Sequence, residues 1–242
     1  MKNEITEYFK DTKSLLYSFL FSLPLFLTYE LLILIAQPDP TLAVRVSVDV
    51  WFKSIFTSLN LNAISWTLTV AVILGFIILY KEREKLRTLR FRYFPILIAE
   101  SLLYAIVTAV IANFLVNLVF AFAPDGSIQT LSVVQKFALS LGAGLYEELF
   151  FRVILVTALI WVFDKVFKEA KWASITSSVV LSALLFSLVH YIGQYGDPFT
   201  LSSFSYRFIF GLLLNGLYVW RGFGVAAWTH ALYDIIVLLI IN

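Results

Sequence analysis

Long runs of apolar residues constrain this chain more than any other feature. A helix needs about 20 mostly apolar residues to cross roughly 30 Å of hydrocarbon. The sequence offers seven candidate spans, at residues 15–36, 64–80, 94–122, 137–163, 172–191, 205–220 and 222–241. Hydrophobic types make up 60% of the 242 residues, and Asp, Glu, Lys and Arg make up 14%, against about 25% in an ordinary soluble domain. We therefore expect an all-α, polytopic transmembrane helix bundle that forms one integral membrane domain over residues 1–242.

Other broad classes of protein find no support in the sequence. No segment shows the alternating pattern of an outer-membrane barrel strand. A net charge of +2 is too small to indicate nucleic-acid binding. The absence of cysteine excludes disulfides and thiolate ligands for a metal. The first apolar run, 15–36, is too long for the apolar region of a signal peptide and lacks an Ala-x-Ala cleavage site, so we expect it to be retained.

The placement of lysine and arginine predicts how the chain crosses the membrane. If the N-terminus lies inside, the inside segments hold 13 of the 18 Lys and Arg residues, six of them in the loop 81–92. The outside segments hold 4, which are Arg45, Lys53, Lys136 and Arg207. This bias predicts seven spans with the N-terminus inside and the C-terminus outside. The loop 81–92 also suits anionic lipid headgroups, although a role in topology alone explains its charge.

One outer segment allows two structures. DVWFKSIFTSL (49–59) has apolar side chains on one helical face, so it would form an amphipathic helix lying in the membrane interface. A loop held at the interface by Trp51 fits the same residues. The sequence leaves this choice open.

Ionisable residues inside the predicted spans are the strongest functional signal, because a charge in the bilayer is costly unless it is paired or hydrated. Eight such residues occur, and both histidines of the chain are among them: Glu30, Glu100, Glu147, Glu148, Arg152, His190, His230 and Asp234. Glu30 and Glu100 have no partner close in sequence. We expect these two to pair across helices or to lie beside a water-filled cavity.

Helical spacing separates the two adjacent glutamates. Glu148 and Arg152 are four residues apart, so they share a helical face and can form a structural salt bridge. Glu147 is rotated by about 100° from Glu148 and points elsewhere. A desolvated carboxyl group without such a partner is suited to exchange protons.

The same spacing recurs on two later spans. Phe186 and His190 are four residues apart in FSLVH, and His230 and Asp234 are four apart in HALYD. A buried histidine by itself is more often a satisfied hydrogen-bonding group than a catalyst. Together with Glu147, however, these groups place several polar side chains on three membrane helices. The free-energy cost of burying them would be high if they served only to hold helices together.

Such a set contains the groups that peptide hydrolysis requires. A carboxylate and an imidazole on either side of a water molecule can activate it as a nucleophile. A second imidazole with a hydrogen-bond donor beside it can stabilise an oxyanion. Hydrolysis by a serine or cysteine nucleophile, zinc hydrolysis of the His-Glu-x-x-His type and nucleotide-driven chemistry have no support. The sequence contains no cysteine, no Gly-x-Ser-x-Gly, no His-Glu-x-x-His and no Walker-type loop.

Three motifs, in order, resemble those of a known family. EELFFR (147–152) fits Glu-Glu-x-x-x-Arg, FSLVH (186–190) fits Phe-x-x-x-His, and HALYD (230–234) fits His-x-x-x-Asn/Asp. These are motifs of the CAAX prenyl endopeptidase and bacteriocin-processing family, the glutamic intramembrane proteases often labelled CPBP or Abi. The likeness covers about residues 140–240.

The resemblance implies a role for each motif residue. Glu147 would be the general base that activates a water molecule, assisted by His190. His230 and Asp234 would form the oxyanion site. The rest of the first motif would orient that site: Glu148 and Arg152.

One residue departs from the prenyl endopeptidases, which have Asn where this chain has Asp234. An amide can donate a hydrogen bond to an oxyanion, whereas an ionised carboxylate repels it. Asp234 would therefore be protonated, or it would orient His230 instead. The departure puts the prenylated substrate in doubt, while activity itself is not excluded.

The resemblance also implies an all-helical bundle of about eight spans around a polar intramembrane cavity open to the cytoplasmic side, so we expect about seven to eight transmembrane helices. Because only seven spans are found, the eighth helix would be hidden in 94–122 or 49–59. The implied activity uses no cofactor and no metal ion, and its substrates would be membrane-associated peptides or lipidated protein tails. We expect a multi-pass protein of the plasma membrane of a prokaryote, in contact with membrane lipid and without nucleic acid.

Two other functions would use the same residues. The candidate catalytic residues are all acceptable zinc ligands, although they are spread over three helices. A non-catalytic protein, either a proton-coupled transporter or an immunity factor that binds a peptide toxin, would also use intramembrane histidines and carboxylates. A transporter is expected to show internal repeats, and none is visible.

The predicted topology places the two histidines at different depths in the membrane. His190 lies near the outer end of its span, whereas His230 lies nearer the inner end of its own. The two imidazoles can meet only if helices tilt strongly or helix ends shift.

Overall fold

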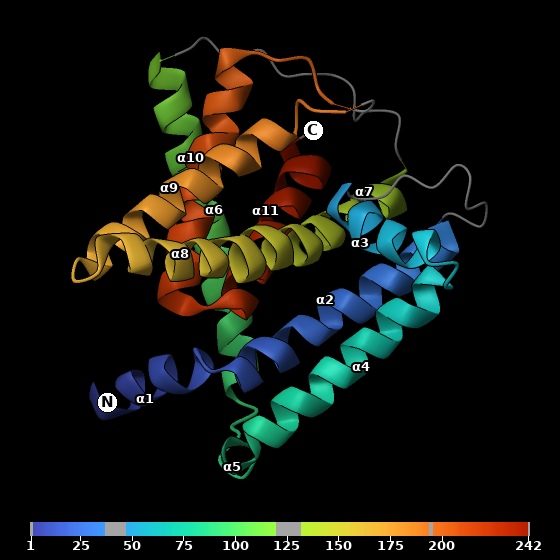
Figure 1. Ribbon diagram of the computed structural model, residues 1–242, viewed down its shortest axis with the longest axis vertical. Helices are drawn as coiled ribbons and strands as arrows, with labels where there is room; N and C mark the ends of the chain where they lie inside the picture. The colour runs from blue at the N-terminus through green and yellow to red at the C-terminus, as the bar shows by residue number, and fades with distance from the viewer. Residues whose placement is uncertain (1, 37–46, 120–131, 194–195, 242) are drawn as a thin grey trace.

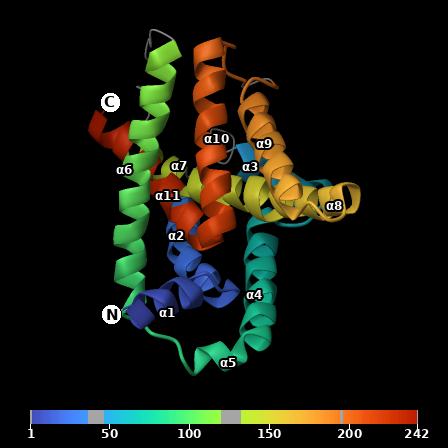
Figure 2. The ribbon, with the colours of Figure 1, turned by 90° about the vertical axis from the view of Figure 1, so that its left-hand side faces the viewer.

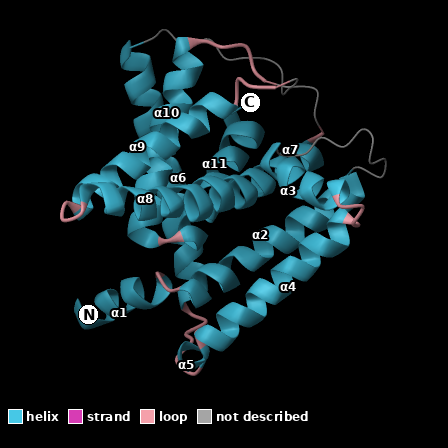
Figure 3. Cartoon of the chain, in the orientation of Figure 1, coloured by secondary structure: helices cyan, strands magenta, loops and turns pink. Residues whose placement is uncertain are grey.

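A computed structural model describes residues 2–36, 47–119, 132–193 and 196–241. Every regular element in these ranges is helical, and they contain no strand, as Figure 3 shows. Two features of the predictions, Arg45 and the end of the span 94–122, lie outside the described residues. The expected all-α helix bundle is confirmed.

Six long helices coincide with six of the predicted spans. They are α2 (Leu15–Ala36), α4 (Ala63–Lys81), α6 (Tyr93–Val119), α9 (Lys171–Val189), α10 (Leu201–Arg221) and α11 (Phe223–Ile236), the last continued by the π-helical segment η4 (Val237–Ile241). Among the described residues, three stretches are helical, long and apolar enough to cross a membrane: Leu15–Ile35, Tyr93–Leu115 and Lys171–Val189. Trp66–Lys81 and Phe223–Leu239 are shorter apolar helices. Hydropathy locates these elements well because an apolar segment in lipid must satisfy its backbone groups internally.

The remaining predicted span, 137–163, is one continuous helix whose winding changes along its length. It consists of α7 (Val133–Gly142), the π-helical segments η2 (Ala143–Glu147) and η3 (Leu149–Val156), and α8 (Thr157–Phe167). We call this element the long helix. A capping box begins it, because the Ser132 side chain accepts a bond from the Gln135 backbone N–H and the Gln135 side chain accepts one from the Ser132 backbone N–H.

Three shorter helices complete the described structure: α1 (Lys2–Thr12), α3 (Ser47–Ser58) and α5 (Arg83–Leu86). The outer segment that allowed two structures is thus a helix, and the interpretation as a loop is wrong. With 12 residues α3 is about 18 Å long, too short to cross the hydrocarbon. Helix α6 runs unbroken over its described length, so no second helix is hidden in that part of 94–122, and α3 is an additional helix that is too short to be an eighth span.

Helix α11 occupies the middle of the bundle. It packs against α2, α6, α7, η2 and α10. Its alanines allow close approach, since Ala226, Ala227 and Ala231 are completely buried. The long helix lies across α6 and α10 in Figures 1 and 2, while α2 and α4 run side by side in Figure 1. The first and third motifs, on the long helix and on α11, therefore lie on elements that contact each other in the middle of the bundle.

The two glutamates that lie inside predicted spans but outside the motifs, Glu30 and Glu100, are both paired across helices. Arg221 Nε on α10 lies 2.5 Å from Glu100 Oε1 on α6, and the Tyr8 hydroxyl donates to the other oxygen of the same carboxylate. Burial and this bond raise the pKa of Tyr8 above its ordinary value, so the hydroxyl remains a donor that ties α1 to the bundle. On the other side of the molecule, Lys53 Nζ on α3 lies 2.9 Å from Glu30 Oε1 on α2.

Candidate active site

A glycine brings the first motif against α11. A Cβ atom at Gly144 would lie 2.5 Å from the Ala227 carbonyl oxygen and 2.6 Å from Ala231 Cβ, so only glycine fits there without displacing α11. The close approach comes just before the two glutamates of the first motif and beside the turn of α11 that carries His230. The helix is π-wound on both sides of Glu148, a winding that is frequent at functional sites.

The second glutamate of the motif joins two helices. Arg152 Nε lies 2.9 Å from Glu148 Oε2, so the salt bridge predicted from their spacing is present. His230 Nδ1, on α11, lies 2.7 Å from Glu148 Oε1. All three side chains are buried. Because an ionised carboxylate can only accept, His230 donates from Nδ1 and its Nε2 atom faces the opposite way.

The first glutamate faces a cavity together with His190. The cavity has a volume of about 60 Å³, and its lining comes from α3, the long helix and α9: Val48, Trp51, Glu147, Phe151, Val189 and His190. A single water molecule needs about 10–15 Å³ on this measure. The cavity therefore has room for water beside both the carboxylate of Glu147 and the imidazole of His190.

The protonation pattern of His190 follows from its partner. Its Nδ1 atom lies 2.7 Å from the Phe186 carbonyl oxygen, one turn back at the end of α9. A carbonyl oxygen can only accept a hydrogen bond, so Nδ1 carries the proton. The neutral ring then has its lone pair on Nε2, where it can accept a hydrogen bond or a proton.

The Phe186 ring connects members of all three motifs. Its centroid lies 5.0 Å from that of His190 and 6.4 Å from that of His230. The guanidinium carbon of Arg152 lies 4.7 Å from the same centroid. Arg152 Nη1 and Nη2 have no hydrogen-bond partner among the described residues, so the ring is the group that faces this part of the cation. The predicted difference in depth does not separate the two imidazoles, because both lie against one aromatic ring.

Asp234 lies at the edge of the cluster. Its Oδ2 atom is 3.6 Å from His230 Nε2, which is too long for a hydrogen bond but within the range of an ion pair. The Asp234 side chain is 22% exposed, against 4% for that of His230. A third polar group can therefore approach His230 Nε2 and the Asp234 carboxyl group together.

The contribution of α3 to the site was not predicted. Val48 and Trp51 line the cavity beside Glu147 and His190. One signal was available, because Asp49 and Lys53 lie four residues apart within an otherwise uncharged helix, which indicates a helix held in a fixed place. Amphipathic patterning alone could not identify the helix that it would contact.

The candidate residues divide into two groups. Glu147 and His190 share the cavity, whereas Glu148, Arg152 and His230 form a buried cluster with Asp234 at its edge. In the part of the chain that the structure describes, no three His, Asp or Glu side chains are arranged to hold one metal ion.

Comparison with known proteins adds one finding. Residues 129–236, just under half of the chain, match the family described as Rce1-like: Type II CAAX prenyl endopeptidase Rce1-like. No curated protein and no solved structure matches the chain. The matched range contains all three motifs, and the apolar helices agree with a membrane location. The resemblance seen in the motifs is thereby confirmed: residues 129–236 match the type II CAAX prenyl endopeptidase Rce1-like family, within an integral membrane protein.

Proposed function

We propose that this protein is a metal-independent intramembrane endopeptidase in which Glu147 and His190 activate a water molecule. One observation carries the proposal: a carboxylate and an imidazole from different helices line one cavity that can hold water. The family match supports the reaction class, since it implies a CAAX-type endopeptidase.

In the proposed reaction, water lies between the Glu147 carboxylate and His190 Nε2. Glu147 takes a proton from the water while His190 accepts a hydrogen bond from its other O–H. The resulting hydroxide adds to the carbonyl carbon of the scissile peptide. The C–N bond then breaks, and the proton held by Glu147 passes to the departing amine. No covalent link to the protein forms.

The tetrahedral intermediate carries a negative oxygen, which we place at His230 Nε2 and Asp234. As an imidazolium, His230 donates Nδ1–H to Glu148 and presents Nε2–H to this oxygen. A protonated Asp234 would add a second donor. Glu148 fixes the orientation of His230, and Arg152 fixes that of Glu148 through its salt bridge.

The proposed substrates are membrane-associated peptides or lipidated protein tails. Four of the six residues that line the cavity are apolar, which suits a peptide side chain that arrives from the bilayer. The expected location is the plasma membrane of a prokaryote.

The test is cleavage of a panel of CAAX-type and leader-type peptides by purified protein, with product masses as the readout. Glu147→Gln keeps the shape of the side chain but removes the base, so we expect cleavage to stop while the variant still inserts and folds. Glu84→Gln is a matched control, because Glu84 is 79% exposed and lies on α5, which contributes no residue to the cavity lining. Full activity of Glu147→Gln would reject the assignment. A chelator is expected to leave the wild-type rate unchanged, and loss of activity that added zinc restores would favour a metal enzyme instead.

A further inference from the structure

Helix α3 supplies one wall of the cavity and is too short to serve as a span. Val48 is 2% exposed and lines the cavity next to the motif residues. Trp51, one turn later, is 41% exposed, and its ring lies edge-on to Phe150 at 5.7 Å between centroids. The two side chains thus form a wall that begins in the interior of the protein and continues to its surface.

A buried ion cluster holds this helix in place. Lys53 Nζ lies 2.9 and 3.1 Å from the two oxygens of Glu30 and 2.9 Å from Asp49 Oδ1. The Tyr29 hydroxyl donates to Asp49 at 2.7 Å, and the Tyr146 hydroxyl donates to Glu30 at 2.6 Å. Burying such charges is costly unless every partner is in position. The cluster therefore fixes α3 relative to α2 and to the residue that precedes Glu147.

A fixed wall next to the attacking water limits what can lie beside the scissile bond. The peptide carbonyl must approach Glu147 and His190, so one of the two side chains flanking that carbonyl enters the space bounded by Val48 and Trp51. That space is apolar on the α3 side, and the cavity has a volume of about 60 Å³, room for a few water molecules. Since the ion cluster prevents α3 from moving aside, a bulky side chain cannot be accommodated by displacement of the helix.

From this geometry we propose that Val48 and Trp51 determine substrate specificity by restricting one residue flanking the scissile bond to a small apolar side chain. The inference rests on the proposed function, because it assumes that bond cleavage occurs at Glu147. It adds a selecting element, α3, that lies outside the residues matching the family.

The experiment uses a peptide that the wild-type protein cleaves, remade with Ala, Val, Leu or Phe at each of the two positions flanking the scissile bond. We expect wild-type kcat/KM to fall from Ala to Phe at one of these positions. Val48→Ala and Trp51→Ala enlarge the space, so the ratio of kcat/KM for Leu to that for Ala should rise about tenfold at the same position.

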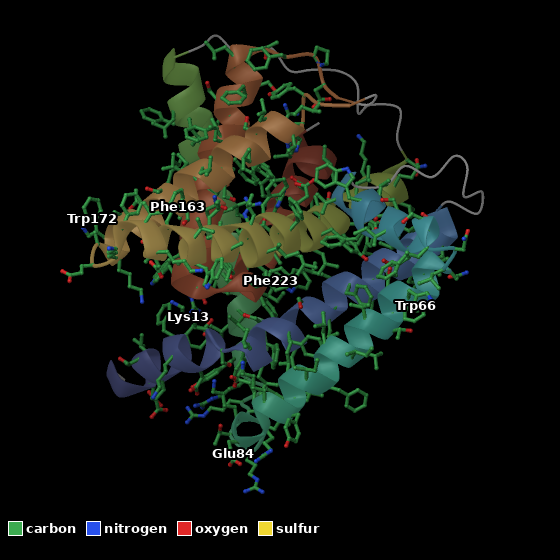
Figure 4. All side chains as sticks on the ribbon, in the orientation of Figure 1. Lys13, Trp66, Glu84, Phe163, Trp172 and Phe223 are labelled. Carbon is green, nitrogen blue, oxygen red and sulfur yellow. The ribbon has the colours of Figure 1, made fainter. Side chains whose placement is uncertain are left out.

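Two control variants remove equal volume without touching the cavity. Val50→Ala lies on the same helix, where Val50 is 46% exposed and is not part of the lining. Trp66→Ala removes a tryptophan of matched exposure, 40%, on α4 at the far edge of the molecule (Figure 4). Both controls should keep the wild-type order of preference.

The outcomes separate this inference from the proposed function. If the wild type cleaves peptides but Val48→Ala and Trp51→Ala keep its side-chain preference, the role of α3 is wrong and the proposed reaction stands. If Val50→Ala and Trp66→Ala change the side-chain preference as much as Val48→Ala and Trp51→Ala do, the role of α3 is also wrong. If the wild type cleaves none of the peptides, the proposed function fails and this inference falls with it.

Discussion

At the scale of single residues, Asp234 is the group whose chemistry the motif leaves open. Its Oδ2 atom lies 3.6 Å from His230 Nε2. The side chain can therefore either donate a hydrogen bond to the oxyanion or orient the imidazole of His230. Asp234→Asn supplies an amide donor of the same shape, and we expect its kcat to stay within about tenfold of wild type. Asp234→Ala removes the donor and should lower kcat about 10²–10³-fold. Steady-state kinetics of both variants measures these changes. An equal loss of kcat in Asp234→Asn and Asp234→Ala would show that the carboxylate itself is required.

Replacement of Glu148 should lower the stability of the protein as well as its activity. Glu148→Gln leaves the buried Arg152 cation without the carboxylate with which its Nε atom pairs, and Nη1 and Nη2 of Arg152 have no hydrogen-bond partner among the described residues. We expect a decrease of about 3–5 kcal/mol in the free energy of unfolding. Unfolding in mixed detergent micelles measures this change. Glu84→Gln, which alters an exposed carboxylate, is expected to have no effect, and a similar loss in both variants would contradict the prediction.

At the scale of elements, the contact between the long helix and α11 depends on Gly144. Gly144→Ala places a methyl group against the Ala227 carbonyl oxygen, so we expect a destabilisation of about 1–3 kcal/mol and slower cleavage. Gly216→Ala is the matched control, since nothing lies within 4 Å of a Cβ atom there. It should leave stability unchanged or raise it by up to about 1 kcal/mol. The free energy of unfolding and the rate of peptide cleavage are measured for both variants. Equal changes in Gly144→Ala and Gly216→Ala would refute a close contact at Gly144.

The elements also show how far sequence reasoning reaches. Hydropathy located the long helices, and spacing along one helix predicted the Glu148–Arg152 pair, because both are local properties of the chain. The partners of Glu148 and Lys53 on other helices depend on how helices cross, which no local pattern encodes. The sequence did not decide between a helix and a loop at residues 49–59 for the same reason. Asp49 and Lys53 of this segment form an ion cluster with Glu30 on α2, and that contact depends on tertiary structure.

At the scale of the whole molecule, three of the four segments predicted to lie inside are in contact with one another. Arg90, in the loop before α6, lies 2.9 Å from Glu7 of α1. Lys13, between α1 and α2, donates to the Val219 carbonyl oxygen near the end of α10 at 2.9 Å. These contacts join the N-terminal region, the loop 81–92 and the α10–α11 junction at one side of the bundle, which agrees with the lysine and arginine bias.

That agreement has a consequence for access to the site. If the basic side is inside, α3 and the end of α9 face outside, and so does the cavity wall that they form. The family resemblance instead implies a cavity open to the cytoplasmic side. The two expectations make opposite statements about which side of the membrane the site faces.

Because the chain has no cysteine, single introduced cysteines can decide between them. Ser58→Cys, exposed at the end of α3, should react with a membrane-impermeant thiol reagent added outside intact cells. Thr88→Cys, exposed in the basic loop, should react only after the membrane is permeabilised. The reverse pattern would place α3 and the cavity on the cytoplasmic side and would overturn the orientation predicted from the charges. In that case the large excess of Lys and Arg would face outward, so the long helix and the motif helices would have to be held by their packing around α11 against the positive-inside bias.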